Sequence, residues 1–166
     1  RKVEPSRSPY MRMRLDILFE ENTIEQLVEA TKQLQLGDKT FKIHCLNNSN
    51  DAIEPKLSRT IRNDYMRQLG YAIDAEVDLD APDTVLGLAI HEGIFYLGEL
   101  VSGEAVWFKH MKKPEMYSTA LSTRDARAIV NIAAPYPDGL KIIDPCCGIG
   151  TVLVEAMSMG INIEGR

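Results

Sequence analysis

The chain has 166 residues, of which 45% are hydrophobic and 26% charged, and its formal net charge is -5 at pH 7. This composition excludes a disordered or collagen-like chain and predicts a soluble globular protein with one large or two small domains. No apolar run approaches the roughly 20 residues that cross a bilayer, and no signal-like pattern opens the chain. Three cysteines, an odd number, argue against a disulfide framework and favour a reducing, cytoplasmic location.

The charge is distributed unevenly. The negative balance by itself disfavours a nucleic-acid partner, and residues 71–108 contain acidic side chains but no Lys or Arg. Residues 1–70 are slightly richer in basic than in acidic side chains, so a basic face can still form there. The carboxylates between Asp74 and Asp83 have no adjacent His or Cys and lead into a Pro-containing turn. We therefore interpret them as turn-forming residues and not as a metal site.

The first part of the chain alternates strand and helix patterns and ends in a hairpin. Apolar residues with period two, or in short runs, predict strands at residues 11–19, 41–45, 75–79, 84–91 and 94–101. Glu92-Gly93 between the last two strands favours a hairpin turn. The predicted helices, each ended by a glycine, are residues 23–36 and 56–69. This order predicts a small α/β domain.

The second part predicts the first unit of a doubly wound fold. A polar segment, residues 109–121, is interpreted as a linker. The elements predicted after it are a helix from residue 122, a strand over 140–143, a turn over 144–150, a helix over 151–159 and a strand over 161–164. The helix from residue 122 is expected to turn Ala126, Ile129, Val130 and Ala133 inward. A strand–helix–strand order is typical of a Rossmann-like parallel sheet.

One turn in the second part carries candidate chemistry, the segment from Asp144 to Thr151. Asp144 stands at the carboxyl end of a strand, where open α/β sheets bind their ligands. Gly148 and Gly150 allow a ligand to approach the backbone. Leu153 replaces the third glycine of a dinucleotide fingerprint, and no Gly-Lys-Ser/Thr of a P-loop is present. The pattern favours a ligand with a sugar and a charged amino-acid tail, and a purely structural turn is the alternative.

This segment, Asp-Pro-Cys-Cys-Gly-Ile-Gly-Thr followed by Glu155-Ala156, resembles the cofactor motif of class I S-adenosylmethionine methyltransferases. It is most similar to the variant in enzymes that methylate exocyclic amines of nucleobases. The resemblance implies S-adenosylmethionine as cofactor and the N-terminal part of a methyltransferase domain over residues 122–166. The cofactor-binding residues that it implies are Asp144, Pro145, Cys147, Gly148, Gly150, Thr151, Tyr117 and Arg124. For the last two, an interdomain packing role is the alternative. No metal site is expected, since the adjacent cysteines lack a second pair at ligand spacing.

The region before residue 108 resembles a THUMP domain, an RNA-binding module. The similar segments are residues 41–44, 57–62, 70 and 77–83, and residues 117–131 resemble the helix before the catalytic domain of the same enzymes. The resemblance implies a THUMP-like RNA-binding region over residues 1–108, with the end of a ferredoxin-like part near 11–37. It also implies structured RNA, tRNA or ribosomal RNA, as partner. Candidate phosphate-binding residues, for which a solvated surface is the alternative, are Lys42, His44, Lys56, Arg59, Arg62 and Arg67.

Together these resemblances imply an RNA guanine-N2 methyltransferase. The family's catalytic Asp/Asn-Pro-Pro-Tyr/Phe loop does not occur in the sequence. We therefore expect the catalytic residues downstream of Arg166, and these 166 residues alone to be an inactive fragment. Exposed strand edges near that end predict a disordered tail, a dimer contact or aggregation. The alternative functions are a non-catalytic THUMP-type RNA-binding module and a DNA amino-methyltransferase.

Overall fold

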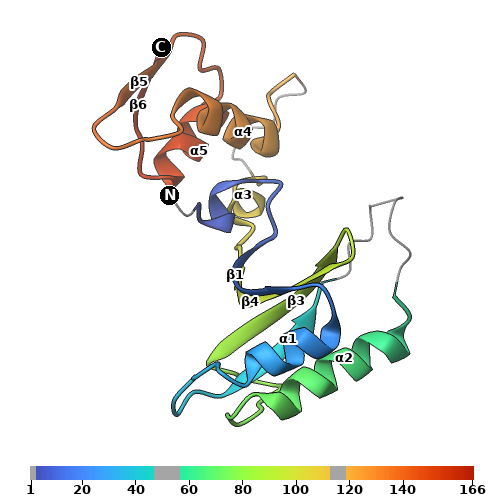
Figure 1. Ribbon diagram of the computed structural model, residues 1–166. Coiled ribbons are helices and arrows are strands. Elements are labelled where there is room, and N and C mark those ends of the chain that lie inside the picture. The colour runs from blue at the N-terminus through green and yellow to red at the C-terminus, as the bar shows by residue number, and fades with distance from the viewer. Residues whose placement is uncertain (1–2, 47–56, 113–118) are drawn as a thin grey trace. The chain divides into compact units, whose positions relative to one another are not determined.

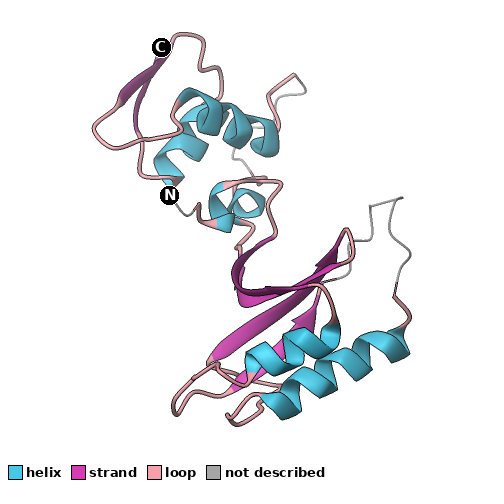
Figure 2. Ribbon diagram, in the orientation of Figure 1, coloured by secondary structure: helices cyan, strands magenta, loops and turns pink. Residues whose placement is uncertain are grey.

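The computed structural model describes residues 3–46, 57–112 and 119–166 and divides into two compact units. Leu15–Val101 form one, here called the central unit, and Arg1–Arg14 with Ser102–Arg166 form the other, the terminal unit. Both units combine helices and strands (Figures 1 and 2), which confirms the predicted α/β class. Within the described ranges, no helix has both the length and the apolar character that crossing a membrane requires.

The described part of the central unit contains a mixed sheet with the strand order β1-β4-β3-β2. Its strands are β1 (Met13–Glu21), β2 (Phe41–Cys45), β3 (Thr84–His91) and β4 (Ile94–Ser102). β2 runs parallel to β3, and β3 forms an antiparallel hairpin with β4. Glu92 and Gly93 at the turn have φ angles of 52° and 78°, as a two-residue hairpin turn requires. The predicted hairpin is therefore confirmed.

Two helices, α1 (Ile24–Thr31) and α2 (Arg59–Ala72), lie on one face of this sheet (Figure 1). The hydroxyls of Thr23 and Ser58 cap them by accepting hydrogen bonds from backbone N–H groups of the first turn. The core of this unit consists of the buried residues Ile24, Leu27, Phe41, Cys45, Leu69, Ile73, Leu86, Leu88 and Leu97. The amphipathic patterns of the sequence thus converge on one apolar layer between helices and sheet.

The predicted ends of these helices are wrong, because glycine does not end either of them. α1 ends at Thr31, whose hydroxyl donates a hydrogen bond to the Val28 carbonyl at 2.8 Å. α2 begins at Arg59, after its Ser58 cap, and continues through Gly70 to Ala72. A glycine inside a helix costs about 1 kcal/mol relative to alanine. Burial of Ile73, which is 4% exposed, offsets that cost and explains why the helix continues.

The strand predicted over residues 75–79 is reduced to a single β-bridge. Phe41 pairs with Val77, and the Asp78 N–H donates to the Phe41 carbonyl at 3.0 Å. The Asp78 carboxylate accepts hydrogen bonds from the N–H groups of Asp80 at 2.9 Å and Ala81 at 3.1 Å. These bonds turn the chain away from the sheet, as short carboxylates commonly do in loops, and the strand cannot continue.

Asp83 joins the segment before β2 to the segment before β3. Its Oδ2 accepts hydrogen bonds from the backbone N–H of Thr40 at 2.9 Å and from the Thr40 hydroxyl at 3.1 Å. The backbone hydrogen bond, and next the hydroxyl hydrogen bond, lower the pKa of the Asp83 carboxyl below its ordinary value of 3.8. The charged form therefore stabilises the fold above that ordinary pKa, and the stabilisation is lost as the pH falls through the lowered value.

We expect Asp83→Asn to lower the melting temperature at pH 7, because the amide replaces a charged acceptor with a weaker one. The difference from wild type should shrink as the pH falls, since the wild-type carboxyl itself becomes protonated. Thermal unfolding followed by circular dichroism over a pH series measures both effects. Asp80→Asn, a change in the same turn, serves as the control. A difference in melting temperature that stays constant down to acidic pH would contradict the role of the Asp83 charge.

The terminal unit contains the predicted strand–helix–strand unit. β5 (Lys141–Asp144) and β6 (Asn162–Gly165) are parallel, and α5 (Thr151–Ser158) connects them. Its described residues also form a short 3-10 helix, η1 (Pro5–Arg7), and the α-helices α3 (Val106–Lys109) and α4 (Thr123–Ala133). The core is formed by Val130, Ala134, Ala156 and Ile161. α3 was not predicted and lies where the predicted linker begins.

α4 turns a partly different face inward than predicted. Ala126 and Val130 are buried, as predicted, but Ala133 is exposed and Ile129 is 45% exposed. Arg127 is buried in its place, with 3% exposed. The reason is a polar one: Arg127 forms an ion pair with a buried glutamate of α5, and this pair sets the rotation of the helix.

The β5–β6 pair exposes part of its apolar surface. Ile143 is 52% exposed, whereas Ile161 is 3% exposed. Asn162–Gly165 form β6. Because exposed apolar side chains on a strand pair favour association with other chains, a dimer contact or aggregation stays a prediction. Size-exclusion chromatography with light scattering measures it.

Candidate functional site

Asp144 ends β5 and begins the loop that leads to α5. Its Oδ1 accepts a hydrogen bond from the Cys146 N–H at 3.1 Å, which holds the carboxylate at the strand end. Oδ2 has no hydrogen-bond partner among the residues that the structure describes. The loop is also braced by the end of β6, because the Arg166 N–H donates to the Asp144 carbonyl at 2.9 Å. A charged acceptor is thus held at the carboxyl edge of the parallel strands.

Two glycines in the loop have left-handed backbone conformations. The φ angle is 52° at Gly148 and 79° at Gly150, in the region that residues with a Cβ rarely adopt. No heavy atom lies within 4 Å of the position that a Cβ on Gly148 would occupy. The backbone at Gly148 therefore faces open space, and the requirement for glycine there is conformational. A ligand can approach the bare backbone at this point.

α5 starts directly at the loop, with Gly150 as its N-cap residue. This N-cap makes no side-chain hydrogen bond to the helix, whereas Thr23, Ser58 and Ser122 cap α1, α2 and α4. The N-terminal end of a helix carries partial positive charge and suits an anionic group. The carboxylate of Asp144 and the start of α5 thus offer opposite charges at the two ends of one short loop.

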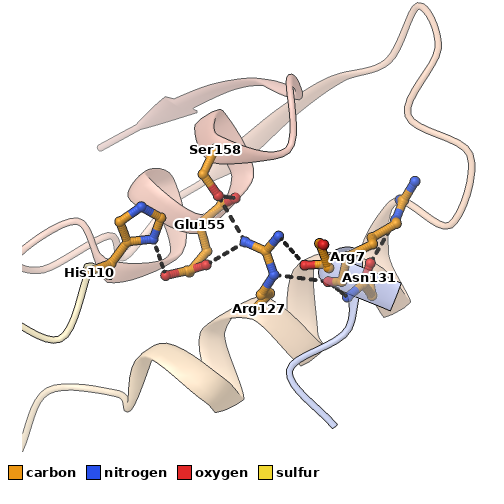
Figure 3. A network of polar contacts seen from close by, with 7 residues as sticks. Arg7, His110, Arg127, Asn131, Glu155 and Ser158 are labelled. Atoms are coloured by element: carbon orange, nitrogen blue, oxygen red, sulfur yellow. Dashed lines mark hydrogen bonds and ion pairs between the residues drawn. The ribbon is translucent and has the colours of Figure 1, made fainter. Parts of the chain in front are cut away.

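Behind the loop, α5 carries a buried carboxylate, Glu155, for which the sequence left open a pocket position or a solvated one. Glu155 is 0% exposed, forms an ion pair with Arg127 at 2.8 Å and contacts the His110 Nδ1 at 2.7 Å. Figure 3 shows the three side chains together with Ser158, Arg7 and Asn131. The sequence does carry a signal: Glu155 is the one charged residue of α5, and it lies next to the buried Ala156. Alone, it does not identify the partners, which come from distant segments.

Arg124 does not lie in the loop. It projects from the first turn of α4, and its guanidinium carbon lies 4.1 Å from the ring centroid of Trp107, a cation–π contact within the terminal unit. Both side chains line an open cavity of about 490 Å³ together with residues 8–12. Tyr117, predicted beside Arg124, lies outside the described residues. The cofactor roles of both residues stay predictions.

The candidate phosphate-binding residues differ in exposure. His44, Arg59 and Arg67 are exposed, whereas Lys42 is half-buried and donates to the Leu79 carbonyl at 3.4 Å. Arg67 pairs with Asp64 at 2.8 Å. Lys56 lies outside the described residues.

Arg62 corrects the expectation that it faces outward. It is half-buried, and its Nε is buried without a hydrogen-bond partner in the described structure. It lies close enough to Cys45 for its charge to act on the thiol. Burial raises the pKa of Cys45, and the positive charge of Arg62 opposes that rise. Arg62 is therefore less accessible for phosphate contact than the exposed Arg59 and Arg67.

The central unit also has a cavity of about 400 Å³ that the sequence did not predict. It opens between α2 and β2 and is bordered by the exposed chain around Val77. Arg67 and Tyr71, one turn apart on α2, both line it, and Tyr71 is 85% exposed. An aromatic ring and a guanidinium group at one apolar groove can accept a planar, charged ligand.

Comparison with known proteins relates the second part of the chain to methyltransferases. Residues 111–166 match the family model described as RMKL-like, methyltransferase domain. A tRNA (guanine(10)-N2)-dimethyltransferase from Methanothermobacter thermautotrophicus is 39% identical over 54 residues, which are 32% of this chain and 16% of that protein. The enzyme of the same name from Methanocaldococcus jannaschii is 27% identical over 96 residues, 55% of this chain and 27% of that protein.

Among solved structures, TrmN from Thermus thermophilus superposes with a TM-score of 0.52 at 17% identity. The match covers 93% of this chain and 48% of that one, and it supports the fold alone. The chain therefore spans well under a third of the curated relatives and about half of this structure. The resemblance to methyltransferases predicted from the loop is confirmed for residues 111–166, the part of the chain that is similar to an RMKL-like methyltransferase domain.

Proposed function

We propose that this chain contributes the cofactor-binding start and an RNA-binding region to an S-adenosylmethionine-dependent RNA methyltransferase acting on guanine N2 in tRNA or ribosomal RNA. The observation that carries the proposal is the loop from Asp144 to Gly150, in which a carboxylate at a strand end is followed by two left-handed glycines and an open helix start. The similarity of residues 111–166 to a methyltransferase domain supports the reaction class.

The residues present fit S-adenosylmethionine. The ligand has an ammonium group, a carboxylate and ribose hydroxyls. Asp144 supplies a charged acceptor for an ammonium or hydroxyl donor, and the start of α5 supplies partial positive charge for a carboxylate. The open space beside Gly148 admits the ligand to the backbone. The residues proposed to hold it are Asp144, Pro145, Cys147, Gly148, Gly150 and Thr151, with Tyr117 and Arg124 as further candidates.

When bound, S-adenosylmethionine supplies an electrophilic methyl group on sulfur. The residues of this chain bind and orient that donor, and none of the 166 is proposed to hold the methyl acceptor. The Asp/Asn-Pro-Pro-aromatic sequence that the resemblance associates with the acceptor does not occur among them. The activity test therefore uses the full-length protein that contains these 166 residues.

The central unit is proposed to bind the RNA as a THUMP-like module. The groove lined by Arg67 and Tyr71 supports this role, because an aromatic ring next to a guanidinium can stack a base and contact its phosphate. The exposed Arg59 at the start of the same helix adds positive charge. Reversing Arg59 and Arg67 to Glu should lower RNA affinity and flatten its salt dependence, as measured by fluorescence anisotropy in a salt series.

The cofactor proposal is tested with the full-length protein by calorimetric titration of S-adenosylmethionine and S-adenosylhomocysteine. Asp144→Ala should weaken binding by about 10- to 100-fold, the equivalent of one charge-assisted hydrogen bond. Glu29→Ala, which removes an exposed carboxylate on α1, is the control and should bind as wild type. Wild-type protein that binds neither ligand would overturn the proposal.

The substrate is tested by incubation with unmodified tRNA, ribosomal RNA and duplex DNA, followed by nucleoside mass spectrometry. The expected product is N2-methylguanosine from one of the RNAs. Methylated adenine or cytosine from the DNA would favour a DNA amino-methyltransferase instead. RNA binding without S-adenosylmethionine binding or product would favour a non-catalytic RNA-binding module.

A further inference from the structure

Glu155 is a charged side chain in the interior of the terminal unit. Its carboxylate is fully buried, and both oxygens are engaged: Oε2 accepts from Arg127 at 2.8 Å and Oε1 contacts the His110 Nδ1 at 2.7 Å. Figure 3 shows His110 and Arg127 approaching the carboxylate from separate segments of the chain. A carboxylate on α5 is therefore fixed at both oxygens to side chains that lie outside β5, α5 and β6.

Arg127 extends this arrangement through the rest of its guanidinium group. Its Nε donates to the Arg7 carbonyl at 2.9 Å and a terminal nitrogen to the Ser6 carbonyl at 2.8 Å. The nitrogen that contacts Glu155 also donates to the Ser158 hydroxyl at 2.9 Å. The planar fork of arginine holds several acceptors in a fixed geometry. Arg127, which belongs to α4, therefore connects Glu155 and Ser158 of α5 to the backbone of η1.

The segment of η1 is in turn fixed to α4. The Arg7 side chain donates to the Asn131 side-chain oxygen at 2.8 Å and to the Ala134 carbonyl at 2.6 Å, and the Asn131 amide donates back to the Arg7 carbonyl at 3.0 Å. Figure 3 shows Arg7 and Asn131 side by side, with dashed lines for the contacts between them. The frame that holds Glu155 is thus itself cross-linked by directional hydrogen bonds, and it has little freedom to follow a displaced helix.

The loop at the other end of α5 is coupled to Glu155 through the backbone. The N–H of Val154, the preceding residue, donates to the Gly150 carbonyl at 2.9 Å. The Gly150 N–H donates to the Cys147 carbonyl at 2.8 Å. A rotation or shift of α5 at Glu155 therefore displaces both Gly150 and Cys147. The position of the glycine loop follows from the position of the buried carboxylate.

An ion pair at this place is not explained by stability alone. Buried ion pairs are often no more stabilising than well-packed apolar residues, because both charges lose their hydration. Apolar contacts, however, allow a helix to slide or rotate more freely than hydrogen bonds to both oxygens of a carboxylate do. The geometry favours a role in orientation.

We infer that Glu155 is a positioning residue for the cofactor loop: held by Arg127 and His110, it fixes α5 so that Gly148 and Gly150 keep the conformation that admits the ligand. The inference rests on the proposed binding of S-adenosylmethionine at this loop. Glu155 itself acts through the helix and the loop backbone, and it is one turn away from the proposed ligand contacts.

The test compares three versions of the full-length protein: wild type, Glu155→Gln and the double variant Glu155→Leu with Arg127→Met. The amide of Glu155→Gln keeps the shape of the side chain and removes its charge. The double variant replaces the ion pair with apolar side chains, and its melting temperature should recover toward the wild-type value. Two properties are measured for each version: hydrogen exchange of the amides between Cys147 and Val154 without ligand, and the calorimetric affinity for S-adenosylhomocysteine.

Both variants should exchange the loop amides faster than wild type and bind S-adenosylhomocysteine about tenfold more weakly, as expected for a misaligned hydrogen-bond set. The double variant is decisive because a purely structural role would restore affinity together with melting temperature. Glu104→Gln, which removes the charge of an exposed ion pair with Lys109, is the matched control and should change neither property. Normal loop exchange and normal affinity in both variants would overturn the inference.

The two proposals can fail separately. Wild-type protein that does not bind S-adenosylhomocysteine would contradict the proposed function, while the hydrogen-exchange comparison would still decide whether Glu155 controls the loop. Wild-type binding with unchanged variants would contradict only the positioning role.

Discussion

Replacing Phe41 with alanine is expected to lower the free energy of unfolding of the central unit by about 3–5 kcal/mol, the usual cost of deleting a large aromatic side chain from a core. Phe41 is 0% exposed and packs in the cluster between the sheet and the two helices. It begins β2, whose neighbour on one side is β3 and whose first residue also bridges to Val77. A cavity at this point therefore removes contacts from strand, bridge and helices together.

Urea denaturation followed by circular dichroism measures this loss, provided that the slope of the transition is unchanged. Tyr71→Ala is the matched control, because Tyr71 is an aromatic residue of the same unit but 85% exposed. Its effect should remain within about 0.5 kcal/mol, as for surface substitutions in general. Equal losses in the two variants would contradict the core assignment of Phe41.

The second large effect is expected in the terminal unit, where Arg127→Met should destabilise the fold by about 3–5 kcal/mol. Arg127 and Glu155 are 3% and 0% exposed, so removal of the arginine leaves a carboxylate in the interior without its main counter-charge. The change also deprives the carbonyls of Ser6 and Arg7 of their donors. Methionine fills a similar volume, which separates the loss of charge from the loss of packing.

Lys109→Met provides the comparison for a surface pair. The Lys109–Glu104 pair has a similar separation of 2.8 Å but is 64% and 68% exposed. Solvent screens such pairs, and their contribution is typically below about 1 kcal/mol. Chemical denaturation of both variants measures the contrast. If Arg127→Met costs no more than Lys109→Met, then Glu155 is not dependent on its arginine for its place in the core.

Sequence patterns located most of the elements in the central unit, because its helices and strands each have an apolar face. The hairpin at Glu92-Gly93 was predicted from a turn sequence whose geometry depends on only two residues. The helix ends and the structure around Val77 were not predicted correctly, since they depend on tertiary contacts. Burial of Ile73 offsets the cost of Gly70 inside α2, and no pattern in the neighbouring sequence indicates this compensation.

The candidate site divides in the same manner. The loop from Asp144 to Gly150 could be predicted because its chemistry lies in seven consecutive residues, and strand, glycines and helix start follow one another in the chain. The contacts behind the loop could not be predicted from the sequence, because only tertiary packing brings together Arg7, His110, Arg127 and Glu155. The misjudged face of α4 has the same origin, since periodicity treats arginine as an outward residue.

The sequence by itself determined the α/β class, the parallel strand–helix–strand unit and the glycine loop at the end of β5, because each depends on neighbouring residues and on local backbone preference. Only the tertiary structure decided how far the helices extend, which arginines are buried and what holds α5 behind the loop. These features depend on charges and apolar surfaces from distant segments, whose desolvation is favourable or costly only once the partners have met.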